Sequence, residues 1–275
     1  MSQPNTKIAF IGAGNMAKAI IGGLIAEGFS PNDLSASGPR LETLEKVGSD
    51  YGISISTDNA STAAKADVIV LSVKPQMLKE VALGLTSSLA HKPLIISLAA
   101  GITTDSINTW LGGEQAIVRC MPNTPSQVRV GASGLFANAN VSDAQKSTTN
   151  AILGAVGIVQ WVDDEALINP VTAVSGSGPA YFFLMMEAMI DAGVGLGLNR
   201  ESATELTLQT ALGAAILAKQ SDVDVAELRR RVTSPKGTTE QAINSFENDQ
   251  IRAIFARAMT ACSNRAVELS EILGK

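Results

Sequence analysis

The chain has 275 residues, enough for one large domain or for two modest ones that each bury a core. Its formal net charge is −5 and its one basic run is Arg229-Arg230-Arg231, which excludes an extended nucleic-acid-binding surface. Charged residues make up 17% of the chain, against about 25% in average soluble domains, and this shortage predicts covered surface and hence a homo-oligomer.

The chain carries no pattern typical of export or membrane insertion. Residues 1–7 hold no charged region that leads into a long apolar stretch. Residues 180–198 are apolar, but Glu187 and Asp191 interrupt them at the spacing of one helical turn, which favours an interface helix over a bilayer span. Two cysteines far apart in sequence make no disulfide framework, so we expect no membrane contact and a reducing, cytoplasmic location.

The first half of the chain alternates short apolar runs with helical patterns. The runs rich in Ile and Val, expected to be strands, are residues 7–11, 34–37, 67–73, 94–98 and 116–120. Helical patterns of crossover length lie between them, notably at 16–27, 41–51 and 77–90. This alternation predicts an α/β fold, namely a doubly wound parallel sheet of the Rossmann type with helices on both faces. Residues 131–137 and 158–162 are candidates for two further strands.

The first strand leads into a glycine-rich turn of the form Gly-x-Gly-x-x-Ala. Gly12 lets the chain turn tightly, Gly14 lets a pyrophosphate approach the backbone, and Ala17 is small enough for helix to pack on strand. The turn therefore predicts dinucleotide binding, with contacts from Ile11, Gly12, Ala13, Gly14, Asn15 and Met16. The alternative is a structural strand–helix turn that binds no ligand.

The end of the second strand predicts which dinucleotide binds. An Asp or Glu there would bind the ribose 2′-hydroxyl of NAD and repel a 2′-phosphate. The chain instead has Ser37 and Arg40, a hydroxyl and a cation, which favours NADPH, with NADH as the alternative. Arg40 also fits a solvated residue at the start of the next helix.

Near Asp163 and Asp164 the pattern changes to long helices rich in Ala, Leu and Met, with no strand candidates. We therefore expect a dinucleotide-binding domain over residues 1–163 and an all-helical domain for dimerisation and substrate binding over 164–275. Residues 201–219 are apolar almost all round, so that helix must be covered on every side. Residues 251–273 form a second long helical pattern.

Late in the chain, Ser234-Pro235-Lys236-Gly237-Thr238-Thr239 predicts a tight turn that ends at a helix start. Thr238 and Gln241 fit a capping box. The next free N–H groups and the helix dipole would hold a small carboxylate, with Ser234, Gly237, Thr238 and Thr239 as the binding residues. The alternative is a simple stop and restart between two helices.

Taken in order, these segments resemble pyrroline-5-carboxylate reductases, NAD(P)H-dependent enzymes that make proline, and the matching motifs spread from Ile8 to Glu247. The family signature over residues 228–247 has a small residue where this chain has Lys236. Family members pair through the helical domain, so the resemblance implies a homodimer or a larger oligomer built from dimers.

The resemblance also implies roles for individual residues. Thr239 and Ser234 match the hydroxyl residues that hold pyrroline-5-carboxylate or proline, and Glu165 matches an acid that would favour the iminium. Similar sequences contact the cofactor at two turns and near its adenosine end, here Ser72-Val73-Lys74-Pro75, Ala99-Ala100-Gly101 and Asn59. Met121-Pro122-Asn123-Thr124-Pro125 resembles a motif that faces the nicotinamide, although two prolines also suit a purely structural loop.

The expected chemistry needs no strong base and no metal ion. The one histidine, His91, lies in a loop on the amino-terminal side of the sheet and is expected to be structural. A protonated imine accepts hydride with little acid help, so position and orientation dominate. The resemblance thus implies hydride transfer from NAD(P)H to the C=N carbon of 1-pyrroline-5-carboxylate, which gives L-proline.

Two alternatives have different signatures. A β-hydroxyacid dehydrogenase-like reductase would need a catalytic Lys on the first long helix after the boundary, and residues 181–191 contain none. A non-catalytic NADP-binding regulator would keep the cofactor groove and lose the chemistry. Ser234, Gly237 and Thr239 favour the enzyme.

Overall fold

The computed structural model describes residues 6–274; residues 1–5, part of the stretch examined for a secretion signal, and residue 275 lie outside the described residues. The chain divides into two compact units. The first runs to Ser177 and includes the residues from Ala261 onward, and the second is Gly178–Thr260. This division falls after the domain boundary expected at residues 163 and 164, which stays a prediction.

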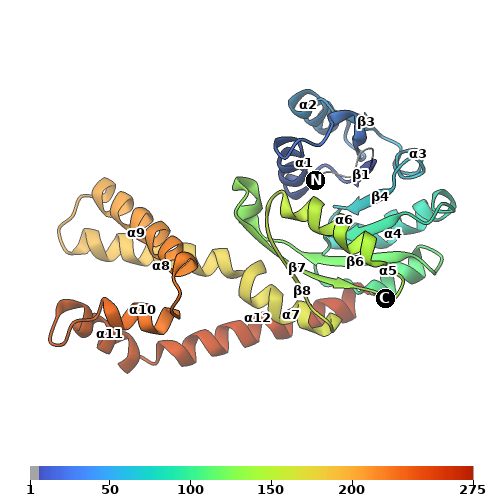
Figure 1. The fold of residues 1–275 in the computed structure, drawn as a ribbon. Helices are drawn as coiled ribbons and strands as arrows, with labels where there is room; N and C mark the ends of the chain where they lie inside the picture. Colours follow the sequence, from blue (N-terminus) through green and yellow to red (C-terminus); the bar gives the residue numbers. More distant parts are fainter. Residues whose placement is uncertain (1–5, 275) are drawn as a thin grey trace. The chain divides into compact units, whose positions relative to one another are not determined.

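The first unit is built on an eight-stranded sheet in the order β3-β2-β1-β4-β5-β6-β7-β8 (Figure 1). The strands are β1 (Ile8–Ile11), β2 (Leu34–Ser37), β3 (Ser54–Ser56), β4 (Val68–Leu71), β5 (Leu94–Ser97), β6 (Ala116–Met121), β7 (Gly131–Ala137) and β8 (Gly157–Trp161). Strands β1 to β6 pair in parallel, and β7 is antiparallel to β6. The Rossmann-type sheet is confirmed, and the strand order changes direction between β1 and β4, where such sheets bind ligands.

Helices cover both faces of this sheet because side chains alternate along the buried strands. Ile8 and Phe10 pack in one core with α1, α2 and α6, whereas Ala9 and Ile11 pack in a second core with α3, α4 and α5. These helices are α1 (Asn15–Ala26), α2 (Leu41–Tyr51), α3 (Asn59–Ala63), α4 (Pro75–Leu85), α5 (Thr104–Trp110) and α6 (Asp143–Gly154). After β8 come a 3-10 turn at Glu165–Leu167, α7 (Ile168–Val171) and a π-helical turn at Thr172–Gly176.

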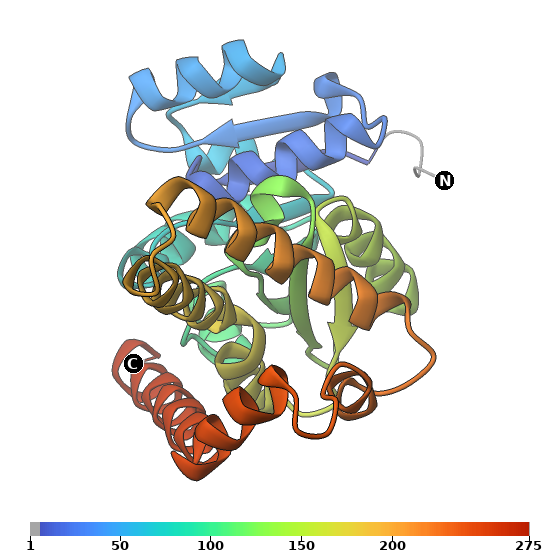
Figure 2. The same cartoon turned by 90° about the vertical axis from the view of Figure 1, so that its left-hand side faces the viewer.

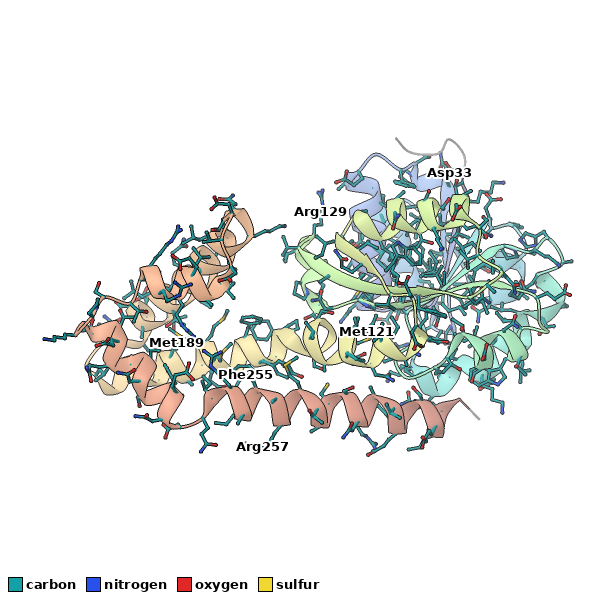
Figure 3. The ribbon with its side chains drawn as sticks, turned by 60° about the horizontal axis from the view of Figure 1, so that its bottom comes forward. Asp33, Met121, Arg129, Met189, Phe255 and Arg257 are labelled. Atoms are coloured by element: carbon teal, nitrogen blue, oxygen red, sulfur yellow. The ribbon has the colours of Figure 1, made fainter. Side chains whose placement is uncertain are left out.

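The second unit is helical, as expected. It contains α8 (Gly178–Gly195), α9 (Arg200–Gln220), α10 (Val225–Arg231), α11 (Thr238–Asn248) and the start of α12 (Ile251–Leu273), and α8 packs against α9 (Figure 2). Many side chains of these helices project outward (Figure 3). Large apolar side chains stay exposed on α8 and α9, among them Phe182, Phe183, Leu184, Leu206, Leu208, Leu212 and Leu217. No helix in the described part of the chain is long and apolar enough to cross a membrane.

Candidate functional site

The turn after β1 is held tightly on both sides. The Gly12 N–H donates to the Ser37 carbonyl at the end of β2, at 2.8 Å. Gly12 has a φ of +102°, and a Cβ on it would lie 2.6 Å from the carbonyl oxygen of Ser72, the residue that follows β4. Only glycine suits this position, because both the backbone angle and the contact exclude a side chain.

Gly14 faces open space instead. A Cβ built on it would meet no atom within 4 Å. Gly14 is the N-cap of α1 and has no side-chain cap, so the first N–H groups of that helix remain available to an anion. Ala17 is fully buried where α1 packs on the sheet. The geometry agrees with the tight turn at Gly12 and the close packing at Ala17, and the contact of Gly14 with a pyrophosphate stays a prediction.

In front of the turn lies a cavity of about 290 Å³. Its lining includes eight residues predicted to contact the cofactor, namely Gly12, Ala13, Gly14, Arg40, Asn59, Ser72, Val73 and Lys74. The other lining residues are Gly38, Pro39, Thr43, Leu44, Met77 and Val81, which the prediction missed. Val73, just before α4, and Met77 and Val81 on α4 are spaced four residues apart, and this spacing was a sequence signal for one wall of the cavity.

Ser37 does not line this cavity. Its side chain is fully buried and its hydroxyl donates to Oδ1 of Asn59 at 2.7 Å. Asn59 itself lines the cavity, as do Arg40, at the N-cap of α2, and Lys74, at the N-cap of α4. Ser37 thus orients Asn59, and the exposed cations at this end of the cavity are Arg40 and Lys74.

The remaining predicted cofactor contacts lie outside the cavity. Ile11 and Ala99 are buried, and Gly101 has a φ of +73° and packs against Leu269 of α12. The others in this set are Asn15, Met16, Pro75 and Ala100. Their contacts with a cofactor stay predictions.

The loop after β6 is joined to the π-helical turn. Asn123 donates from Nδ2 to the Ser175 carbonyl at 3.1 Å and accepts from the Ala132 N–H at 2.9 Å. Met121, labelled in Figure 3, packs against Gly176, where a Cβ would lie 2.5 Å from its Cε. Asn123 and Pro122 are buried, so the loop is firmly structured.

Glu165 lies beside this region, in the 3-10 turn after β8. Its Oε1 accepts from the Thr104 N–H at 2.8 Å and from Nη1 of Arg119 at 3.0 Å, and its Oε2 accepts from the Thr104 hydroxyl at 2.8 Å. The carboxylate therefore bridges the start of α5 and strand β6.

His91 lies apart from these groups. It precedes β5, and its Nε2 is 2.9 Å from the Ala66 carbonyl oxygen.

The late turn opens α11 in the second unit. Pro235 and Lys236 are its central residues, Lys236 has a φ of +60°, and the Gly237 N–H donates to the Ser234 carbonyl at 3.0 Å. These are features of a type II turn. The predicted capping box at Thr238 is wrong, because Gly237 is the N-cap and no side chain caps this helix.

The first amides of α11 are nevertheless available. Helix geometry leaves the N–H groups of Thr238 and Thr239 without an intrahelical acceptor. The Ser234 and Thr239 side chains are exposed beside them. Glu240 accepts from the Lys236 N–H at 2.8 Å and so stabilises the turn.

A Rossmann-type sheet with a cavity where its strand order reverses is typical of dinucleotide-dependent oxidoreductases. Two family models match the chain: "Pyrroline-5-carboxylate reductase dimerisation" over residues 165–269 and "NADP oxidoreductase coenzyme F420-dependent" over residues 7–101. The pyrroline-5-carboxylate reductase of Pseudomonas aeruginosa is 55% identical over 275 residues, and the match covers 100% of this chain and 100% of that one. The chain therefore belongs to the pyrroline-5-carboxylate reductase family.

Solved structures agree with this assignment. A pyrroline-5-carboxylate reductase from Coxiella burnetii is 49% identical with a TM-score of 0.93, over 97% of this chain and 99% of that one. The Plasmodium falciparum pyrroline carboxylate reductase, solved with NADP bound, is 30% identical with a TM-score of 0.86, over 98% of this chain and 100% of that one. The chain thus resembles these enzymes across both units.

Proposed function

We propose that the chain reduces the C=N bond of 1-pyrroline-5-carboxylate with NADPH and releases L-proline. The observation that carries the proposal is the exposed turn at the start of α11, where amides and hydroxyls gather without a capping side chain. The helix dipole there favours an anion by about 0.3–2 kcal/mol.

The cavity fits a dinucleotide. The space in front of Gly14 admits a pyrophosphate against the backbone, and the amides at the start of α1 would bind it. NADPH, when bound, supplies the hydride. Arg40 and Lys74 would neutralise phosphate groups, and Asn59 would bind the adenosine ribose.

We infer a preference for NADPH over NADH from the same end of the cavity. Strand β2 ends in Ser37 and the chain continues through Gly38 and Pro39 to Arg40, so no carboxylate is available there for a ribose 2′-hydroxyl. Replacement of Arg40 by Ala is expected to raise KM for NADPH more than for NADH. Equal changes in the two KM values would show that Arg40 does not contact the 2′-phosphate.

At the late turn, the N–H groups of Thr238 and Thr239 would hold the substrate carboxylate. The Thr239 hydroxyl would bind the ring nitrogen and the Ser234 hydroxyl would add a further contact. Catalysis then rests on position, because a protonated imine needs no general base.

Steady-state kinetics with NADPH and pyrroline-5-carboxylate test the proposal. The unaltered chain is expected to consume NADPH only when the imine is present. Thr239→Ala is expected to lower kcat/KM for the imine by about tenfold or more, as loss of one hydrogen bond to a charged group implies, while NADPH binding persists. Thr239→Ser retains the hydroxyl and is the matched control. Equal loss of imine reduction and NADPH binding in Thr239→Ala would contradict the assignment.

We also infer a homodimer, alone or within a larger oligomer, in the cytoplasm. The family dimerisation segment at residues 165–269 and the exposed apolar side chains of α8 and α9 support the dimer. The two free cysteines, Cys120 and Cys262, suit a reducing compartment.

A further inference from the structure

Glu165 has both carboxylate oxygens bound by protein donors. Two of these donors come from Thr104 and the third from Arg119, at 2.8 to 3.0 Å. The Arg119 side chain is 5% exposed and the Glu165 side chain 19%, so the ion pair is largely removed from water. Both oxygens of this carboxylate are therefore occupied by hydrogen bonds within the protein.

The segments that Glu165 joins lead to two loops. Thr104 opens α5 and follows the turn Ala99-Ala100-Gly101, and Arg119 lies in β6 just before the loop that begins at Pro122. Strands β5 and β6 are parallel, with Ser97 paired to Arg119. Both loops therefore leave from the same edge of the sheet, the edge at which such folds bind ligands.

The turn after β5 and helix α5 also contact the C-terminal end of α12 and the residue that follows it. A Cβ on Gly101 would lie 3.1 Å from Cβ of Leu269, and the Ser106 hydroxyl donates to the Gly274 carbonyl at 2.9 Å. Those contacts are neutral. The contact made by Glu165 is charged, and removal of one partner leaves a buried, unpaired ion that the structure must rearrange to solvate.

We propose that the turn after β5, at this ligand-binding edge of the sheet, contacts NADP, and that Glu165 is a positioning residue that holds the turn in shape by joining Thr104 to Arg119. This role differs from direct stabilisation of the iminium, which the family resemblance implied. The proposal rests on the proposed reductase function where it is tested by KM for the imine. The NADPH dissociation constant, measured without imine, tests it independently of that function.

The test compares Glu165→Gln, Arg119→Met and the double variant. NADPH dissociation constants are measured by nucleotide fluorescence without imine, and KM for pyrroline-5-carboxylate is measured at saturating NADPH. Each single variant is expected to raise the NADPH dissociation constant about fivefold or more, and the double variant to add less than about twofold, because the residues act as one unit. KM for the imine stays within about twofold of the unaltered value.

Arg119→Lys is the conservative control. Arg119 makes a single Nη1 to Oε1 hydrogen bond, so an ammonium can replace the guanidinium here. NADPH affinity within about twofold of the unaltered chain is expected for this variant.

Thr104→Val keeps the test decisive if a charge variant fails to fold. It removes the hydrogen bond from the Thr104 hydroxyl to the Glu165 carboxylate, keeps the ion pair, and is expected to raise the NADPH dissociation constant about threefold. The proposal is overturned if Glu165→Gln and Thr104→Val leave that constant unchanged, or if Glu165→Gln lowers only kcat for the imine. Failure of the unaltered chain to reduce the imine would instead refute the proposed function, while NADPH binding still reports on Glu165.

Discussion

At the scale of single residues, Gly12 and Gly14 differ in their surroundings, because Gly12 is tightly packed and Gly14 faces open space. Gly12→Ala forces a side chain into a positive φ and against the Ser72 carbonyl, and is expected to lower the unfolding free energy by about 1–3 kcal/mol. Gly14→Ala enters open space and is expected to change it by less than about 0.5 kcal/mol. It should nevertheless weaken NADPH binding about tenfold, because the methyl group occupies the space of the pyrophosphate.

Urea denaturation and NADPH fluorescence titration measure the two effects on the same samples. If Gly14→Ala destabilises the chain as much as Gly12→Ala does, Gly14 serves the turn and not the ligand.

Cys120 predicts a pH dependence of stability. Burial raises the pKa of its thiol to about 12, while a hydrogen bond with Ser133 opposes the shift. The pKa of this thiol in the unfolded chain is about 8.5. Between pH 8.5 and pH 12, unfolding therefore releases a proton that the folded chain keeps. This contribution is fully present below about pH 8.5 and is lost as the pH rises towards 12.

Between pH 8.5 and pH 10.5 the unfolding free energy should therefore fall with a steeper slope for the unaltered chain than for Cys120→Ala. The difference in slope corresponds to about one proton released on unfolding. Cys262→Ala is the control and should keep the steeper slope. Urea unfolding across this range gives the comparison, and identical slopes for the unaltered chain and Cys120→Ala would contradict it.

Sequence predicted the tight turn at Gly12 because backbone sterics alone require a glycine there. It did not predict that Ser37 acts through Asn59. The alternation of β2 directs Ser37 away from the core that contains Leu34 and Ala36, but its partner stands at the start of α3. Neither α3 nor β3 was predicted, so nothing in the pattern placed Asn59 beside Ser37.

At the scale of elements, the turn before α11 holds a lysine where glycine would suit better. Lys236 has a φ of +60°, a conformation that costs an L-residue about 1–2 kcal/mol. Lys236→Gly removes that strain but adds freedom to the unfolded chain, so a net gain in unfolding free energy of up to about 1 kcal/mol is expected. Lys236→Val, which is branched at Cβ, should destabilise the chain.

Gln250 offers a matched control, since its φ is +58° in the link between α11 and α12. Gln250→Gly should give a similar gain in urea denaturation. Loss of stability in Lys236→Gly alone would show that the lysine side chain supports the turn.

Element prediction succeeded where an apolar stripe is long. The bounds of α2 and α12 match the expected ranges 41–51 and 251–273. Strand β3 was missed because Ser54-Ile55-Ser56 has one apolar residue. The pattern Ser/Thr-x-x-Gln occurs at Ser142 and at Thr238, yet a capping box forms only at Ser142. At Thr238 the positive φ of Lys236 turns the chain so that the helix already begins after Gly237.

At the scale of the whole molecule, the second unit exposes more apolar surface than a stable monomer needs. Phe183 is 62% exposed and Leu212 55%. Burial of such a side chain contributes about 1.5–3 kcal/mol when it is complete. The low fraction of charged residues predicted covered surface, but sequence could not say which faces stay open, because that depends on how α8 and α9 pack against each other.

Leu212 and Leu83 allow a matched test of where copies of the chain associate. Both are 55% exposed, Leu212 on α9 of the second unit and Leu83 on α4 of the first. If the dimer forms through α9, Leu212→Glu buries an unpaired charge in the interface and should weaken association by about 3 kcal/mol or more, whereas Leu83→Glu adds only a solvated charge. Light scattering coupled to size exclusion should then show a fall in mass for Leu212→Glu alone. A fall for Leu83→Glu with none for Leu212→Glu would move the interface to the first unit.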